Sequence, residues 1–234
     1  MFIRSLRVAP IEEDTYVTRI PVVRHLMQRE SLRLTSPVTC FVGDNGSGKS
    51  TLIEAIAIAA GFDPGGGPLR DRAFRGQIHP THSPLSRWLT LRGRDIPMRG
   101  YFLRAETHYD TVTVFDTLPD AEQSRHEMSH GESVMSILGE QIDGAGLYIF
   151  DEPESGLSVV RQMALVAEIY QAVRRGAQFI IATHSPIMLA IPDAAIIDIT
   201  EEGLEETVYE EAEAVIATRE FLEDPQGTIR YILG

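Results

Sequence analysis

The chain has 234 residues, 43% of them hydrophobic, which fits one sizeable globular domain. Its longest apolar candidate, LIEAIAIAAGF at 52–62, is broken by Glu54 and is too short to span a bilayer. The start of the chain lacks the apolar stretch of a signal peptide, and the lone cysteine, Cys40, excludes a disulfide framework. We therefore expect one cytoplasmic domain over 1–234, without direct membrane insertion.

The net charge of −13 is unevenly spread along the chain. Residues 1–117 carry 15 basic and 12 acidic side chains (+3), whereas residues 118–234 carry 6 and 22 (−16). A protein held to nucleic acid by a general basic surface would not show this balance, so nucleic acid is not the favoured partner. The seven glutamates at 201–213 predict a solvated face, with a docking surface for a basic partner as the alternative.

The first predicted elements are a strand at 2–8, forming an N-terminal antiparallel β element, and a buried strand at 37–42. A glycine-rich segment follows, GDNGSGKS, which matches G-x-x-x-x-G-K-[ST] in full. A helix pattern comes directly after it, so the motif stands between a strand and a helix, as a P-loop requires. The predicted phosphate-binding residues are Gly43, Asp44, Asn45, Gly46, Ser47, Gly48, Lys49, Ser50 and Thr51.

The chemistry of a phosphate site explains these residue types. The glycines let the backbone curl, so that its N–H groups face a polyphosphate at the start of a helix. Lys49 is the only lysine in a chain with 20 arginines, which indicates a position where a compact ammonium is needed and a planar guanidinium does not fit. We expect Lys49 to reach the β and γ phosphates and the Ser50 hydroxyl to bind Mg2+.

The segment 61–104 that follows begins with GFDPGGGPLRDRAFRG. This stretch is rich in glycine and proline, which interrupt helices and strands, and is typical of a loop. Residues 70–104 hold eight arginines interleaved with aromatic residues, a combination that can bind single-stranded nucleic acid. We prefer a small β/α lobe whose arginines meet nucleotide phosphates or the acidic C-terminal half. His79 and His82 could be taken as a metal-binding pair, but two ligands in a segment broken by prolines would make a poor metal site.

Two further buried strands end in polar residues. LYIF, at 147–150, is followed by Asp151 and Glu152, at the strand end where α/β proteins bind ligands. Asp151 would support Mg2+, and Glu152 would accept a proton from the attacking water. The strand in AQFIIATHSP (177–186) ends near His184, which we expect to face the same γ-phosphate, so the predicted catalytic residues are Lys49, Glu152 and His184.

Together these segments resemble the ABC-type ATPases, over roughly residues 37–200. GDNGSGKS matches the family's Walker A motif, LYIFDE its Walker B motif and His184 its switch histidine. The family's D-loop is similar to Ser155, Gly156, Leu157 and Ser158. The chain looks closest to small stand-alone bacterial predicted ATPases, akin to the heads of chromosome-maintenance and DNA-repair ATPases. The resemblance implies a three-layer α/β P-loop NTPase fold with a mostly parallel central sheet. Residues 1–106 and 143–234 would form its nucleotide-binding core and about 107–142 a small helical signature lobe, with one or two C-terminal helices closing the domain.

The family signature, Leu-Ser-Gly-Gly-Gln, aligns with Met128-Ser129-His130-Gly131-Glu132, 22 residues before Asp151 if counted from the serine. Ser129 and the Gly131 N–H, at the start of a helix, would form a second anion site. In this family the signature faces the γ-phosphate of the opposing subunit. The resemblance therefore implies a head-to-tail homodimer with two sandwiched ATPs. His130 and Glu132 depart from the family pattern, and a histidine there predicts pH-sensitive binding.

The Q-loop is the weakest match. A strand pattern at 99–110 lies where this loop should be, but the expected glutamine is absent. Glu106 is the best stand-in, with Arg104 nearby, and it could also meet Mg2+. Gln77 is the alternative, in a stretch that does not read as a strand end.

Our leading hypothesis is Mg2+-dependent ATP binding and hydrolysis by a soluble ABC-type ATPase. An ATP-driven homodimer would power or gate a process of an unidentified protein partner. Two alternatives stay open, the nucleotide-binding subunit of a membrane transporter and an ATP sensor that hydrolyses little.

Overall fold

The computed structural model describes residues 1–233 except 75, 78–81, 94–96 and 118–128. The strands are β1 (Ser5–Val8), β2 (Leu32–Arg33), β3 (Val38–Gly43), β4 (Gly67–Pro68), β5 (Leu89–Arg92), β6 (Gly100–Arg104), β7 (Leu147–Asp151), β8 (Gln178–Ala182), β9 (Ala195–Ile199) and β10 (Leu204–Thr207). The helices are α1 (Pro21–Gln28), α2 (Lys49–Ala60), α3 (His108–Asp116), α4 (His130–Gln141), α5 (Val159–Arg174), α6 (Pro186–Leu189), α7 (Glu213–Glu223) and α8 (Pro225–Leu233). No helix among the described residues is both long enough and apolar enough to cross a membrane.

The central sheet has seven described strands in the order β10-β9-β3-β8-β7-β6-β4. The strands β9, β3, β8, β7 and β6 are parallel, and the edge strands β10 and β4 are antiparallel to their neighbours. Because parallel strands share one direction, their carboxyl ends meet at one edge of the sheet. At that edge Asp151 stands opposite Ala182 of β8 and Arg104 of β6. The predicted mostly parallel sheet is confirmed.

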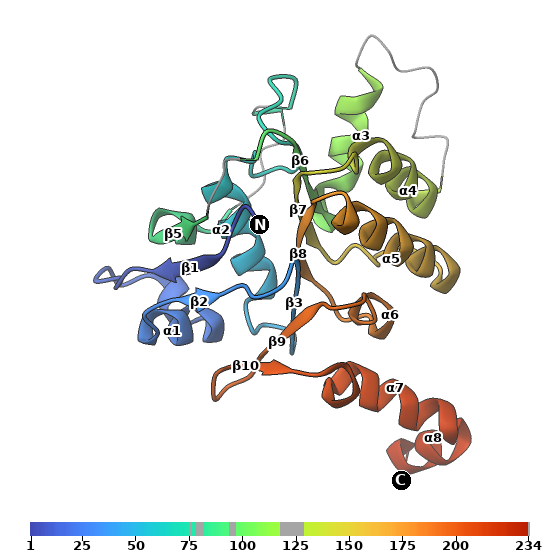
Figure 1. Ribbon diagram of the computed structural model, residues 1–234. Coiled ribbons are helices and arrows are strands. Elements are labelled where there is room, and N and C mark those ends of the chain that lie inside the picture. Colours follow the sequence, from blue (N-terminus) through green and yellow to red (C-terminus); the bar gives the residue numbers. More distant parts are fainter. Residues whose placement is uncertain (75, 78–81, 94–96, 118–128, 234) are drawn as a thin grey trace.

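The sheet is the middle of three layers. Side chains alternate between its two faces, and each face packs against other elements. On β7, Leu147 and Ile149 join an apolar cluster with α2 and the N-terminal strands. Tyr148 and Phe150 face the other way and join a cluster with α4 and α5. Figure 1 shows the sheet between these two groups of elements. The predicted three-layer α/β fold is confirmed.

The N-terminal element is a small antiparallel sheet in the order β2-β1-β5. Its position on the central sheet depends on Gln178, a fully buried residue of β8. The Gln178 side chain accepts hydrogen bonds from the N–H groups of Phe2 (2.7 Å) and Ile3 (2.8 Å) and donates to the Ile3 carbonyl (2.6 Å). The antiparallel element is thus confirmed. However, β5 belongs to it rather than to a separate lobe within 61–104, so that prediction was wrong for residues 89–92.

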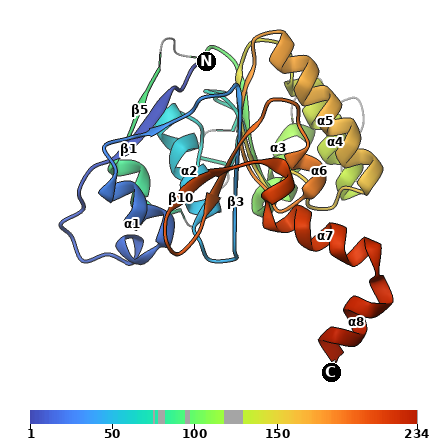
Figure 2. The same ribbon diagram turned by 60° about the horizontal axis from the view of Figure 1, so that its bottom comes forward.

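The predicted end of one strand needs correction, and the C-terminal helices differ in how they pack. The strand predicted at 99–110 ends at Arg104, because the chain turns there: the buried Thr107 hydroxyl donates to the Gly65 carbonyl (2.7 Å) and α3 begins at His108. Of the two C-terminal helices, α7 packs on the domain through the buried Val215, whereas α8 has no buried residue. Figures 1 and 2 show α7 and α8 leading away from the sheet toward the C-terminus. The division into a core and a signature lobe stays a prediction.

Candidate active site

The P-loop joins β3 to α2 and adopts a backbone that favours glycine. Gly43, Gly46 and Gly48 have φ angles of 133°, 86° and 97°. A Cβ atom at Gly43 would lie 2.5 Å from the Ile199 carbonyl oxygen, and one at Gly48 would lie 2.3 Å from Cγ2 of Ile20. Glycine is therefore required at 43 and 48 by conformation and by space, and at 46 by conformation alone.

Lys49, the only lysine, folds over this loop. Its Nζ donates hydrogen bonds to the carbonyls of Gly43 (2.7 Å) and Asp44 (2.9 Å), and the residue is only 5% exposed. Burial lowers the pKa of Lys49, while the nearby carboxylates of Glu152 and Asp151 oppose this shift. Because phosphate oxygens bind an ammonium more strongly than neutral carbonyls do, a polyphosphate would displace these two contacts.

Asp151, at the end of β7, fits a magnesium site. It is 6% exposed, and burial raises the pKa of its carboxyl from 3.8 to about 7, against a hydrogen bond from the Ser50 side chain. Within the described residues its Oδ1 is buried without a hydrogen-bond partner. Such an oxygen beside a serine hydroxyl suits a hard cation that takes its other ligands from phosphates and water. No cluster of three or more His, Cys, Asp or Glu residues that could hold a metal occurs in the described chain.

Glu152 follows Asp151 and turns toward the P-loop. Its φ of 51° is unusual for a residue other than glycine, and its N–H donates to the Ala182 carbonyl of β8 (2.9 Å). The Oε1 atom lies 3.8 Å from Nε2 of His184. Strained backbone of this kind persists where the surrounding structure holds it, often at functional sites.

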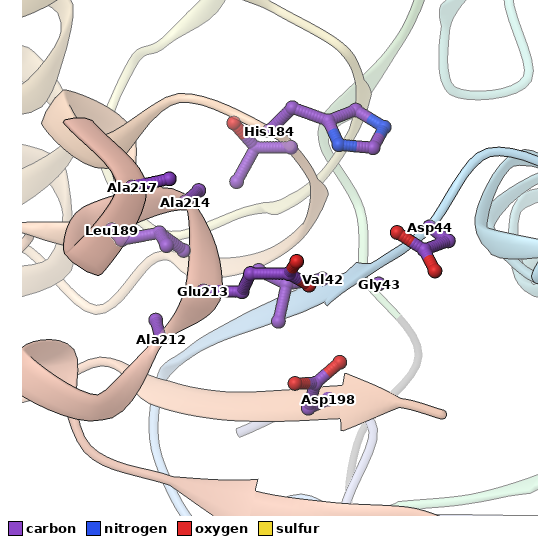
Figure 3. A pocket seen from close by; sticks show the side chains of 11 residues that line it. Val42, Gly43, Asp44, His184, Leu189, Asp198, Ala212, Glu213, Ala214 and Ala217 are labelled. Atoms are coloured by element: carbon purple, nitrogen blue, oxygen red, sulfur yellow. The ribbon is translucent and has the colours of Figure 1, made fainter. Parts of the chain in front are cut away.

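Two cavities, each of about 220 Å³, adjoin the P-loop. The first is lined by Ile20, Asn45, Gly46, Gly48, Lys49, Ser50, Thr51 and Glu152. The second lies beside Asp44, and Figure 3 shows the carboxylates of Asp44, Asp198 and Glu213 around one space, with His184 nearby. Burial raises the pKa of Asp198, and the Asp44 charge adds to this effect. Because these acids repel anions, the first cavity is the better place for a polyphosphate.

Comparison with known families identifies the domain. A family model described as "AAA domain" matches residues 23–87, which include the P-loop. A second, described as "AAA domain, putative AbiEii toxin, Type IV TA system", matches residues 100–190, which include Asp151, Glu152 and His184. The chain carries a P-loop ATPase domain. The predicted resemblance to this class of ATP-binding proteins is confirmed.

Solved structures similar to the ATPase domain include two distant ones. The first is described as "An inward-facing conformation of a putative metal-chelate type ABC transporter", with 16% identity, a TM-score of 0.43, and coverage of 78% of this chain and 76% of that one. The second is the SMC head domain from Thermotoga maritima, with 13% identity, a TM-score of 0.48, and coverage of 89% and 99%. A search of curated proteins found no match.

The signature segment of the ATPase domain starts α4 as predicted, but its own glutamate fills the helix start. Ser129 is the N-cap, and Glu132 accepts hydrogen bonds from the Ser129 N–H (2.9 Å) and hydroxyl (2.7 Å). These bonds, and one from Arg161 (3.0 Å), lower the pKa of Glu132. Ser129, Gly131 and Glu132 are not among the residues that line the P-loop cavity. Met128 and the His130 side chain lie outside the described residues, so the predicted pH sensitivity is untested.

The signature packs against the D-loop of the same chain. A Cβ atom at Gly131 would lie 2.6 Å from the Gly156 carbonyl oxygen, so only glycine permits this approach. Leu157 is buried, and Ser158 caps α5 by accepting a hydrogen bond from the Arg161 N–H. Ser155, at the start of the loop, donates its N–H to the Glu152 carbonyl (3.0 Å).

Of the two candidates for the Q-loop role, the structure brings Glu106 to the carboxyl edge of the sheet. Glu106 follows β6 directly, pairs with Arg104 (3.0 Å), and its charge contributes to raising the pKa of Asp151. Arg104 also forms a buried ion pair with Glu54 of α2 (2.8 Å). Gln77 is exposed in a turn and lines neither P-loop cavity. Of His79 and His82, only His82 is described.

Sequence reasoning gave no role to Glu154 and Gln162, which contact the loop of His184. Glu154 accepts hydrogen bonds from the Thr183 hydroxyl and the His184 N–H, and Gln162 accepts one from the Ser185 hydroxyl. These partners lie 29, 30 and 23 residues away in sequence, and one of the donors is a backbone group. Residue types at a spacing do not reveal such contacts.

Proposed function

We propose that this chain is a Mg2+-dependent ATPase whose ATP is sandwiched at composite sites of a head-to-tail homodimer. The dimer would power or gate the process of an unidentified protein partner. One observation carries the proposal: Lys49, Ser50 and Glu152 line a single cavity, and the Asp151 carboxylate accepts a hydrogen bond from the Ser50 side chain while its buried Oδ1 has no hydrogen-bond partner among the described residues. These are the groups that phosphoryl transfer to water requires.

Each residue has a separate task in this account. The P-loop N–H groups and Lys49 would bind the β and γ phosphates, so that the γ-phosphate faces Glu152. Ser50 and Asp151 would hold Mg2+, which neutralises phosphate charge. Glu152 would accept the proton of the attacking water, and His184, 3.8 Å from it, would donate a hydrogen bond to the γ-phosphate.

The homodimer is supported by the position of the signature. Ser129 and Gly131 start α4 on the D-loop side and do not line the P-loop cavity. One chain therefore presents a phosphate cradle and, elsewhere, a second helix start, where a phosphate would have to displace the Glu132 carboxylate. A two-fold axis would bring each helix start onto the other copy's γ-phosphate, giving two equivalent sites.

The proposal is tested by measuring phosphate release from Mg-ATP. Glu152→Gln should lower kcat by at least about 100-fold, the contribution expected of a general base, with ATP still bound. Lys49→Ala should lose ATP binding itself. Wild-type-like turnover by Glu152→Gln would refute the assigned base.

The same assay separates the alternatives. Negligible turnover by the wild-type chain at saturating Mg-ATP, with ATP-dependent dimerisation intact, would establish an ATP sensor instead. Co-purification with a membrane subunit would favour the transporter role. A cytoplasmic location stays part of the proposal.

A further inference from the structure

Glu154 holds the loop that carries His184. Its Oε1 accepts a hydrogen bond from the Thr183 hydroxyl (2.7 Å) and another from the His184 backbone N–H (2.8 Å). The Thr183 oxygen in turn accepts from the Ser185 N–H (3.0 Å). One carboxylate oxygen thus fixes the backbone of three consecutive residues.

A second side chain, that of Gln162 on α5, also contacts this loop. The Gln162 side-chain oxygen accepts a hydrogen bond from the Ser185 hydroxyl (2.6 Å), and its nitrogen donates to the Leu157 carbonyl (3.0 Å). Ser185 also caps α6 through the N–H groups of Ile187 and Met188. Glu154, just before the D-loop, and Gln162, on α5 just after it, therefore hold the loop of His184 at two points.

Burial makes the contact of Glu154 with the Thr183 hydroxyl hard to replace by water, whereas the contact with the His184 N–H is exposed. Thr183 is fully buried, and the second carboxylate oxygen of Glu154, Oε2, is buried without a hydrogen-bond partner in the described chain. If the carboxylate were removed, a buried hydroxyl and a backbone N–H would lose their acceptor. Unsatisfied buried donors are costly, so the loop would be expected to rearrange.

The His184 imidazole depends on this loop for its position. The side chain is 40% exposed, and among the described residues its one recorded polar contact is the 3.8 Å approach to Glu152. The backbone of 183–185 therefore determines the position of the His184 Cα–Cβ bond, from which the ring extends. We infer that Glu154 is a positioning residue for hydrolysis, which places the His184 imidazole beside Glu152 and the γ-phosphate. This inference rests on the proposed ATPase function.

Two measurements on Glu154→Ala test the inference, with Glu154→Gln as the conservative variant. In the nucleotide-free protein, amide hydrogen exchange at His184 should accelerate by about 10-fold in Glu154→Ala, because its acceptor is lost. With Mg-ATP, kcat should fall by about 10- to 100-fold, while the dissociation constant for ATP changes by less than about 2-fold, since the P-loop is untouched. Glu154→Gln keeps an acceptor oxygen and should restore both values to near wild type.

Glu168→Ala is the matched control, because Glu168 is exposed on α5 and should alter neither measurement. Unchanged exchange at His184 in Glu154→Ala would overturn the inference, as would faster exchange with an unchanged kcat. An equal fall in kcat for Glu154→Gln would also overturn it, since the charge rather than the acceptor would then matter. Absent turnover in the wild-type chain would instead refute the proposed function, and the exchange measurement, which needs no nucleotide, keeps the two failures distinct.

Discussion

Replacing Asp151 by asparagine should stabilise the nucleotide-free, magnesium-free protein at neutral pH, although it removes a proposed metal ligand. Burial raises the pKa of the Asp151 carboxyl from 3.8 to about 7. The folded protein therefore holds this proton more tightly than the unfolded chain does. The free energy of unfolding should fall as the pH rises from about 4 to about 7, because folding then buries a charged carboxylate.

The magnitude follows from the difference between the two pKa values. At about 1.4 kcal/mol per pH unit, a carboxyl shifted from 3.8 to about 7 costs up to about 4 kcal/mol of stability above pH 7. Solvent screening reduces this little, because Asp151 is only 6% exposed. Asparagine has a similar shape, can still accept from the Ser50 hydroxyl, and carries no charge.

The assay is urea unfolding of the wild type and Asp151→Asn at pH 4.5, 6 and 8 with a chelator present. The variant should gain stability relative to the wild type as the pH rises, and added Mg2+ at pH 8 should narrow the gap by stabilising only the wild type. Asp14→Asn, at a side chain that is 91% exposed, serves as the control and should show no such trend. A stability difference between Asp151→Asn and wild type that does not change with pH would refute the reasoning.

Three further predictions concern the P-loop and the buried polar contacts. Gly48→Ala should weaken ATP binding in calorimetry by at least about 10-fold, because its Cβ has no room, whereas Gly46→Ala faces open space and should cost only about 1 kcal/mol of strain. Gln178→Leu should lower the free energy of unfolding by about 2–4 kcal/mol in urea, because it leaves the buried N–H of Ile3 and the half-buried N–H of Phe2 unpaired. Arg104→Met should cost about 3–5 kcal/mol by stranding the Glu54 carboxylate, and adding Glu54→Gln should recover part of it. For each of the three variants, an ATP affinity or a free energy of unfolding equal to that of the wild type would contradict the corresponding contact.

Much of the fold follows from local patterns in the sequence. The buried strands before Gly43 and Asp151 are short apolar runs bounded by turns, and the P-loop spacing fixes the start of α2 at Lys49. The strand predicted through residue 110 failed because the turn after Arg104 depends on a contact between Thr107 and Gly65, 42 residues earlier. Pairing of β5 with β1 was also missed, since register between distant strands leaves no local signal.

The candidate site likewise has features that local sequence patterns predict and contacts that they do not. Lys49, Ser50 and Glu152 could be predicted to share a cavity, because parallel strand ends meet at one edge of the sheet. The capping of α4 by Glu132 is a short-range pattern that the Ser-x-x-Glu spacing could have revealed. The contacts of Glu154 with the His184 loop could not be predicted, because one donor is a backbone N–H whose position depends on the tertiary fold.

The central claim, a site shared between two copies, is tested most directly by mixing two inactive variants. Glu152→Gln lacks the base but keeps its signature, whereas Ser129→Arg blocks the signature but keeps the P-loop and the base. In a mixed dimer, one composite site is assembled from intact parts. An equal mixture should recover up to about a quarter of wild-type ATP hydrolysis, because about half the dimers are mixed and each has one working site. Activity no higher than that of the two variants measured separately would contradict the composite site.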